Sequence, residues 1–110
     1  MITRLLAQST VTDLDRARDW YDRVLDRAPD AEPMPGLIEY HLGDAFGLQV
    51  WAEPARAGRS TVVLDESDLD VLADRLAAGG VTDERPADIS AGRALQLSDP
   101  DGNRVVFTGE

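Results

Sequence analysis

An internal repeat constrains this chain more than any other feature of its sequence. At a constant offset of 55 positions, Thr12-Asp13-Leu14-Asp15 aligns with Ser67-Asp68-Leu69-Asp70, and Arg4 aligns with Arg59. Each tetrapeptide is typical of a helix start, because a hydroxyl residue is followed three positions later by an acidic one. At this offset the helix start, the strand before it and the phase of the helix all match without a gap, which indicates a duplicated unit. We therefore expect two similar halves.

The first half is predicted to have the order β-α-β-β-β. Residues 4–11 favour a strand, and the helix that follows carries apolar residues at helical spacing, namely Leu14, Ala17, Tyr21, Val24 and Leu25. Prolines in 29–36 indicate a weak, edge-like second strand. Residues 37–42 and 46–52 flank Gly43-Asp44-Ala45, which predicts a hairpin.

The second half is predicted to repeat that order. Residues 60–65 favour a strand, and the helix that follows Ser67 carries an apolar face and ends at Gly79-Gly80. Weak strand material is expected around Val81 to Arg85, followed by strands at 94–98 and 104–108. The last two strands are joined by the turn Asp99-Pro100-Asp101-Gly102.

Length and composition limit both the architecture and the function. A chain of 110 residues suits one core, so we expect a single domain with module one at 1–55 and module two at 56–110. The formal charge of -10 argues against nucleic acid as a partner. The chain has no Cys, and its eleven basic residues are all Arg, which excludes thiol and lysine Schiff-base chemistry. No apolar run approaches the length needed to span a membrane, and the N-terminal residues are too polar for a signal peptide, so we expect a cytoplasmic protein without membrane contact.

Two motifs carry a resemblance to a known family. The segment from Val11 to Tyr21 (VTDLDRARDWY), followed by Val24-Leu25, resembles the first-helix signature of the vicinal oxygen chelate superfamily, which is glyoxalase/bleomycin resistance protein/dioxygenase-like. Asp99-Pro100-Asp101-Gly102-Asn103 is similar to the hairpin before that superfamily's last strand. The resemblance covers essentially the whole chain. It implies an α+β fold of two tandem βαβββ modules that form a barrel-like cleft.

The resemblance also implies where metal ligands would lie. Members that bind a divalent ion take one side chain from each of four strands, and a metal site there needs His, Glu or Gln. The matching positions in this chain hold Leu6, Gln49, Thr61 and Val106. One amide oxygen is a poor ligand set, so we expect no metal and no other cofactor.

Strand alternation extends the expected cleft lining from these positions to their i±2 neighbours. The predicted ligand-binding residues are Leu6, Gln8, Glu39, Gln49, Trp51, Thr61, Val63, Gln96, Arg104 and Val106. This mixture of apolar and hydrogen-bonding groups is typical of an organic-ligand pocket. The alternative is a cleft filled by its own side chains that serves stability alone.

Two residues are candidates for acid/base chemistry. His41 is the only histidine, and Glu39 is expected on the cleft face, where it would act as a base or pair with a ligand cation. Arg104 is the alternative partner for Glu39. Trp51 is expected either to stack on a planar or cationic ligand or to pack in the core or a dimer interface.

The sequence favours a metal-free protein of the glyoxalase/bleomycin-resistance type that sequesters or senses a small organic molecule. The alternative is a glyoxalase-like lyase, isomerase or dioxygenase with a metal held by non-standard ligands, and a third possibility is an assembly domain. Whether the chain is an enzyme stays open at this stage. A homodimer is expected, because C2 dimers predominate and family members of this length commonly pair.

Overall fold

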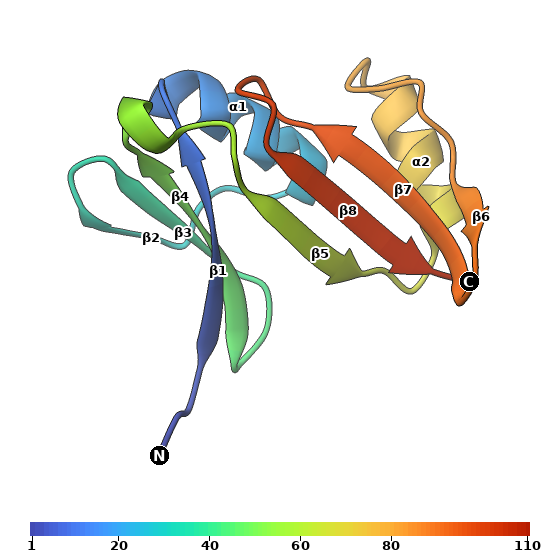
Figure 1. Cartoon of the computed structure of the whole chain (residues 1–110), viewed down its shortest axis with the longest axis horizontal. Coiled ribbons are helices and arrows are strands. Elements are labelled where there is room, and N and C mark those ends of the chain that lie inside the picture. The colour runs from blue at the N-terminus through green and yellow to red at the C-terminus, as the bar shows by residue number, and fades with distance from the viewer.

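The computed structural model describes residues 1–110 and contains two helices and eight strands (Figure 1). The first half holds β1 (Leu5–Val11), α1 (Leu14–Leu25), β2 (Ala31–Met34), β3 (Leu37–His41) and β4 (Phe46–Ala52). A short 3-10 turn, η1 (Pro54–Arg56), connects it to the second half. The second half holds β5 (Thr61–Asp65), α2 (Leu69–Ala78), β6 (Ala87–Ile89), β7 (Gly92–Ser98) and β8 (Arg104–Gly109).

Each half forms its own four-stranded mixed sheet, with orders β1-β4-β3-β2 and β5-β8-β7-β6. In both sheets the first strand pairs in parallel with the last, and the remaining neighbours are antiparallel. The predicted α+β fold of two βαβββ modules is confirmed. The sheets meet along β1 and β5 near η1 and diverge from there, so they form an open arrangement rather than a closed barrel (Figure 1).

Both helices begin where the repeat placed them, but each cap lies one residue later than predicted. The Asp13 side chain accepts from the Arg16 N–H at 3.1 Å, and Asp68 accepts from the Val71 N–H at the same distance. A carboxylate satisfies a free N–H at a helix start and also complements the helix dipole there. Asp therefore takes the cap in preference to the preceding Thr12 and Ser67.

One face of each sheet packs against a helix, and the two packed faces share one hydrophobic core. Helix α1 contacts β4, and α2 contacts β7 and β8. The residues that point toward the helices form a single cluster of 17 buried side chains that draws on both halves, among them Tyr21, Tyr40, Leu48, Leu76 and Phe107. The opposite faces of the two sheets are covered by no helix, and we call them the helix-free faces.

The turn before β8 is hydrogen-bonded to both halves of the chain. Asn103 is fully buried; its side chain accepts from the Ser60 N–H at 2.8 Å and donates to the Thr10 carbonyl at 2.8 Å. The buried Asp99 carboxylate accepts from the Tyr21 hydroxyl at 2.8 Å. Burial raises the pKa of the Tyr21 phenol, so this group stays a hydrogen-bond donor at ordinary pH.

The predicted strand around Val81 to Arg85 is wrong. After α2 ends, the Val81 N–H donates back to the Leu76 carbonyl, and the Val81 side chain packs against the core. These residues therefore serve as the exit from the helix, and the edge strand β6 forms later, opposite Gly92–Ala94. Neither helix has the length and apolar character needed to cross a membrane.

Candidate functional site

A chain of hydrogen-bonded polar side chains crosses the helix-free face of the first sheet. Gln8 and Gln49 are register partners on β1 and β4, and Gln49 is in turn opposite Glu39 on β3. The Gln8 amide donates to Gln49 Oε1 at 2.9 Å, and the Gln49 amide donates to Glu39 Oε2 at 2.7 Å. His41 completes the chain with Nε2 at 3.0 Å from Glu39 Oε1. Three predicted ligand-binding residues are thus brought into direct contact.

Glu39 is the electrostatic centre of this network. Its residue is only 6% exposed, and both of its carboxylate oxygens accept hydrogen bonds. The hydrogen bond from His41, followed by that from Gln49, holds the pKa of Glu39 below its usual range although burial opposes the shift. Arg4 lowers the pKa further through its charge. The predicted pairing with Arg104 is therefore replaced by His41, Gln49 and the nearby Arg4.

These interactions define what the two acid/base candidates can do. A carboxylate with a lowered pKa and two occupied oxygens is a weak proton acceptor. Because ionised Glu39 can only accept, we assign the hydrogen of this contact to His41 Nε2. The arrangement is suited to presenting fixed donors and acceptors, since each side chain is oriented by its neighbour.

A pocket of about 430 Å³ adjoins the network at Gln8. It lies where β1, β4 and the start of β5 converge with η1, and it is lined by Gln8, Thr10, Trp51, Glu53, Arg56, Arg59 and Ser60. The Trp51 indole N–H donates to Glu53 at 3.0 Å, and Arg56 lies 3.6 Å from the same carboxylate. The Trp51 ring passes over Gly36 in the β2–β3 turn. Trp51 therefore forms a fixed, half-buried wall.

The predicted residues of the second sheet form a separate group. Thr61 is opposite Arg104, Val63 is opposite Val106, and Gln96 is also opposite Val106. Val63 is 62% exposed on this helix-free face. Gln96 also borders a small pocket of about 240 Å³ at the β7 edge, beside Trp20. No hydrogen bond or pocket joins these five residues to Leu6, Gln8, Glu39, Gln49 and Trp51.

The four positions implied as metal ligands do not fit a divalent metal. Leu6 is an alkyl side chain whose Cδ2 lies next to where a Cβ on Gly47 would be, and Val106 offers no lone pair either. No group of three or more His, Cys, Asp and Glu side chains in this structure is placed to hold a metal ion. The absence of metal in solution stays a prediction.

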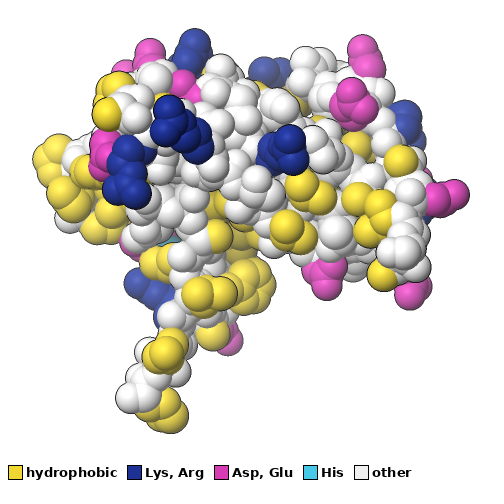
Figure 2. Space-filling model, viewed as in Figure 1, with side chains coloured by type: hydrophobic (Ala, Val, Ile, Leu, Met, Phe, Trp, Pro, Cys, Tyr) yellow, Lys and Arg dark blue, Asp and Glu magenta, His cyan; other side chains and the backbone are white.

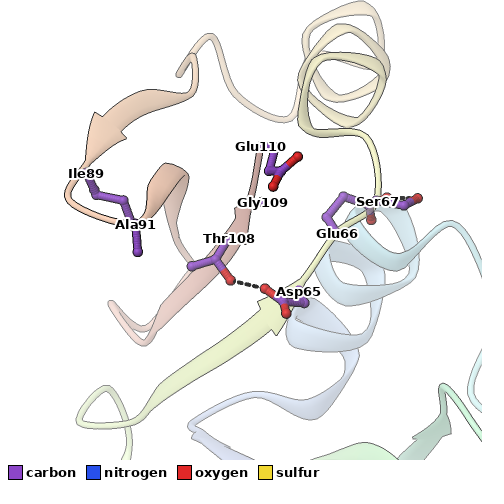
Figure 3. A pocket seen from close by; sticks show the side chains of 8 residues that line it. All are labelled: Asp65, Glu66, Ser67, Ile89, Ala91, Thr108, Gly109 and Glu110. Atoms are coloured by element: carbon purple, nitrogen blue, oxygen red, sulfur yellow. Dashed lines mark hydrogen bonds between the residues drawn. The ribbon is translucent and has the colours of Figure 1, made fainter.

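The largest pocket, of about 770 Å³, lies at the far end of the second sheet (Figure 3). Three carboxylate side chains line it, those of Asp65, Glu66 and Glu110, and Thr108 donates a hydrogen bond to Asp65. It includes none of the residues predicted for the cleft, and it is formed by the exposed ends of β5, β6 and β8. Size alone therefore does not identify the site.

The residues that sequence reasoning missed lie in and beside the connection between the modules. Glu53, Arg56, Arg59 and Ser60 line the pocket at Trp51, yet motif matching assigned them no role. Only Arg59 had a signal, because the 55-residue repeat aligned it with Arg4 at the lead-in to the first strand of each module.

The family assignment rests on a match over nearly the whole chain. Residues 5–107 match the sequence model of the Glyoxalase/Bleomycin resistance protein/Dioxygenase superfamily. The chain belongs to this superfamily. No protein with a curated description matches the chain significantly.

Solved structures of the glyoxalase/bleomycin resistance superfamily have the same fold. A glyoxalase/bleomycin resistance protein from Catenulispora acidiphila is 27% identical, with 94% of this chain and 95% of that one covered and a TM-score of 0.86. TnmS3, an antibiotic binding protein from Streptomyces sp. CB03234, is 25% identical, with coverage of 96% and 93% and a TM-score of 0.80.

More distant structural matches include both a binding protein and an enzyme. A bleomycin-binding protein in complex with bleomycin is 20% identical, covers 97% of this chain and 98% of its own, and has a TM-score of 0.79. A lactoylglutathione lyase from Agrobacterium tumefaciens is also 20% identical, with coverage of 94% and 90% and a TM-score of 0.76. At this identity the likeness shows the fold alone, and the function must be argued from this chain's own residues.

Proposed function

We propose that this protein binds a small organic molecule on its helix-free faces, without metal-dependent chemistry. The observation that carries the proposal is the Gln8–Gln49–Glu39–His41 network and the pocket that adjoins it at Gln8. The network fixes polar groups in place, and Trp51 supplies an aromatic wall beside them. The pocket lining is otherwise polar, so it favours a ligand held by hydrogen bonds and charge as well as by contact with the Trp51 ring.

Two similarities support a binding function. The antibiotic binding protein TnmS3 shares the fold at 25% identity over nearly the full length of both chains. The more distant bleomycin-binding protein shows that the fold accommodates an organic ligand. Binding by this chain is our inference from its own lining residues, to which these similarities add.

The competing proposal is a glyoxalase-like lyase, isomerase or dioxygenase with a metal on non-standard ligands. Glu39 and His41 are in contact and both have donor atoms that bind metals, but they already bond to each other. Gln49 is the only further side chain in contact with Glu39 that has a metal-binding atom, and it makes this contact through its amide N–H rather than its oxygen. This set is two strong donors at most, fewer than the three protein ligands usual in catalytic zinc sites.

We also propose that the protein is a homodimer. The helix-free faces expose apolar side chains, and the two halves of the predicted lining are not joined within one chain. A second copy that covers one of these faces would bury the apolar side chains and bring further lining residues to the site.

A fragment screen followed by two-dimensional ¹H–¹⁵N NMR tests the proposed binding. The reporters are the Gln8 and Gln49 side-chain amides and the Trp51 indole N–H, and the Trp20 indole on α1 is the internal control. We expect ligands that shift the three reporters and leave Trp20 unchanged, and Gln49→Leu should weaken them about tenfold. A screen whose binders shift only Trp20, or no reporter at all, would contradict the proposal.

A further inference from the structure

The arginines of this acidic chain divide into two groups. Eight of the eleven bond to a carboxylate or a backbone carbonyl within the chain: Arg16, Arg18, Arg23, Arg27, Arg56, Arg75, Arg85 and Arg93. The side chains of Arg4, Arg59 and Arg104 make no hydrogen bond and no ion pair, although the chain holds 21 acidic residues. Arginines without a partner are unexpected in a chain with so many more acidic than basic residues.

All three unpaired arginines belong to the helix-free side of the sheets. Alternation places Arg59 on the same side as Thr61 and Val63, and Arg104 is directly opposite Thr61. The Arg104 N–H donates to the Ser60 carbonyl, which keeps Arg104 beside the start of β5. Arg4 lies two positions before Leu6 and acts on the charge of Glu39. Figure 2 shows basic side chains gathered on the viewed face over η1 and the start of β5.

Arg59 also lines the pocket that holds Trp51 and Gln8. The one carboxylate in that lining, Glu53, is already engaged by the Trp51 indole and by Arg56. Arg59 is therefore the free charged donor of the pocket. A guanidinium next to an aromatic wall matches a ligand that has a planar ring and an oxyanion on it, since the guanidinium fork bonds carboxylates with two parallel hydrogen bonds.

We propose that the pocket is an anion subsite that takes an aromatic carboxylate, with the ring against Trp51 and the carboxylate on Arg59. This inference rests on the proposed binding function and names its ligand class. It reverses what the formal charge of -10 suggests, because the one carboxylate in the pocket lining is already paired, whereas Arg59 is not. Arg4 and Arg104 add further positive charge on the helix-free side of the sheets.

A matched fragment set tests the ligand class. Naphthalene, indole and quinoline are each supplied as the carboxylate, the neutral amide and the methylammonium derivative, and binding is followed at the Trp51 indole N–H at constant ionic strength. We expect at least one carboxylate to bind about tenfold more tightly than its amide and its ammonium partner. Arg59→Gln should abolish that preference, while Arg85→Gln, which removes the same charge from a surface pair with Asp74, should leave it unchanged.

The outcomes separate this inference from the proposed function. Amides or ammonium compounds that shift Trp51, Gln8 and Gln49 as strongly as the carboxylates would overturn the anion subsite and leave small-molecule binding intact. A carboxylate preference that survives Arg59→Gln would remove Arg59 from the subsite and overturn the inference. Fragments that move none of the three reporters would overturn both proposals.

Discussion

Glu39 shows how a single buried charge is tolerated on the helix-free face. Removing a carboxylate from water costs several kcal/mol unless its oxygens are bonded. Here one oxygen bonds to His41 and the other to Gln49, and the charge of Arg4 is nearby. These hydrogen bonds offset the cost of burying the carboxylate and also fix the orientation of His41 and Gln49. Four polar side chains therefore form one hydrogen-bonded row.

Replacing Glu39 with Gln should destabilise the protein in a pH-dependent way. The lowered pKa of Glu39 means that its ionised form stabilises the fold above about pH 4.3, the ordinary value for an unfolded Glu, and that this contribution is lost as pH falls through the lower folded pKa. We expect Glu39→Gln to cost about 1–3 kcal/mol at pH 7. Denaturant unfolding should show the gap to wild type shrinking below about pH 4.

The matched control is Glu32→Gln on the exposed edge strand β2, because Glu32 makes no hydrogen bond or ion pair. Its effect on unfolding should be small. If Glu39→Gln and Glu32→Gln gave the same unfolding curves at pH 7, the stabilising role of the Glu39 network would be refuted.

At the residue scale, the sequence predicted orientation better than contact. Alternation along β3 and β4 placed Glu39 and Gln49 on one face, and that placement is seen in the structure. The Gln8–Gln49 contact depends on the parallel pairing of strands that are 41 positions apart, and no local pattern encodes that register. Arg59 was overlooked because nothing in the linker sequence shows that it would border the pocket.

At the scale of elements, the β7–β8 turn does more than reverse the chain. Gly102 adopts a positive φ of 92°, and the turn places Asp99 and Asn103 inside the core. Asn103 bridges the end of β1 and the start of β5, and Asp101 accepts from the Thr12 N–H at 3.1 Å. The turn therefore joins both halves next to the pocket at Trp51, and it sets the separation of Thr10 and Ser60 there.

Replacing Asn103 with Ala should be strongly destabilising. The Ser60 N–H would lose its acceptor, and the buried Asp99 carboxylate would lose one donor. Unsatisfied buried polar groups cost about 1–3 kcal/mol each, so we expect a loss of roughly 2–4 kcal/mol in thermal or denaturant unfolding. Gln96→Ala, an exposed change on the neighbouring β7, is the control and should cost less than about 0.5 kcal/mol. Equal effects would contradict this account of the turn.

The repeat predicted the elements well because each of its signals is local. A capping segment and an apolar face at helical spacing located both helices, and the hairpin signals located β3, β4, β7 and β8. The edge strand β6 was misplaced because its three residues are all exposed and carry no hydrophobic alternation. Only pairing with β7 defines it.

At the scale of the molecule, apolar side chains remain uncovered outside the core. Leu5 is 74% exposed and Phe46 is 53% exposed, and the two are register partners at one end of the first sheet. Figure 1 shows the N-terminus projecting from this end, and Figure 2 shows hydrophobic side chains along it. On the helix-free face of the second sheet, Val63 is 62% exposed beside Val106, and exposed apolar groups that lie together favour burial against another surface.

The homodimer predicts a light-scattering mass of twice one chain over a wide range of concentration. Val63→Ser should weaken association, because Val63 is 62% exposed on the helix-free face of the second sheet, where a second copy would bury it. Val71→Ser is the control, since Val71 is 62% exposed on α2, away from both helix-free faces. A mass of one chain at every concentration would contradict the dimer.

Elemental analysis of protein purified without chelator tests the central claim of a metal-free binding site most directly. The implied ligand positions hold Leu6, Gln49, Thr61 and Val106, and the two strongest donors, Glu39 and His41, bond to each other. We predict far less than one zinc, nickel, manganese or iron per chain. One metal ion per chain, lost on Glu39→Gln or His41→Ala, would contradict the account and make a metal-dependent enzyme the better conclusion.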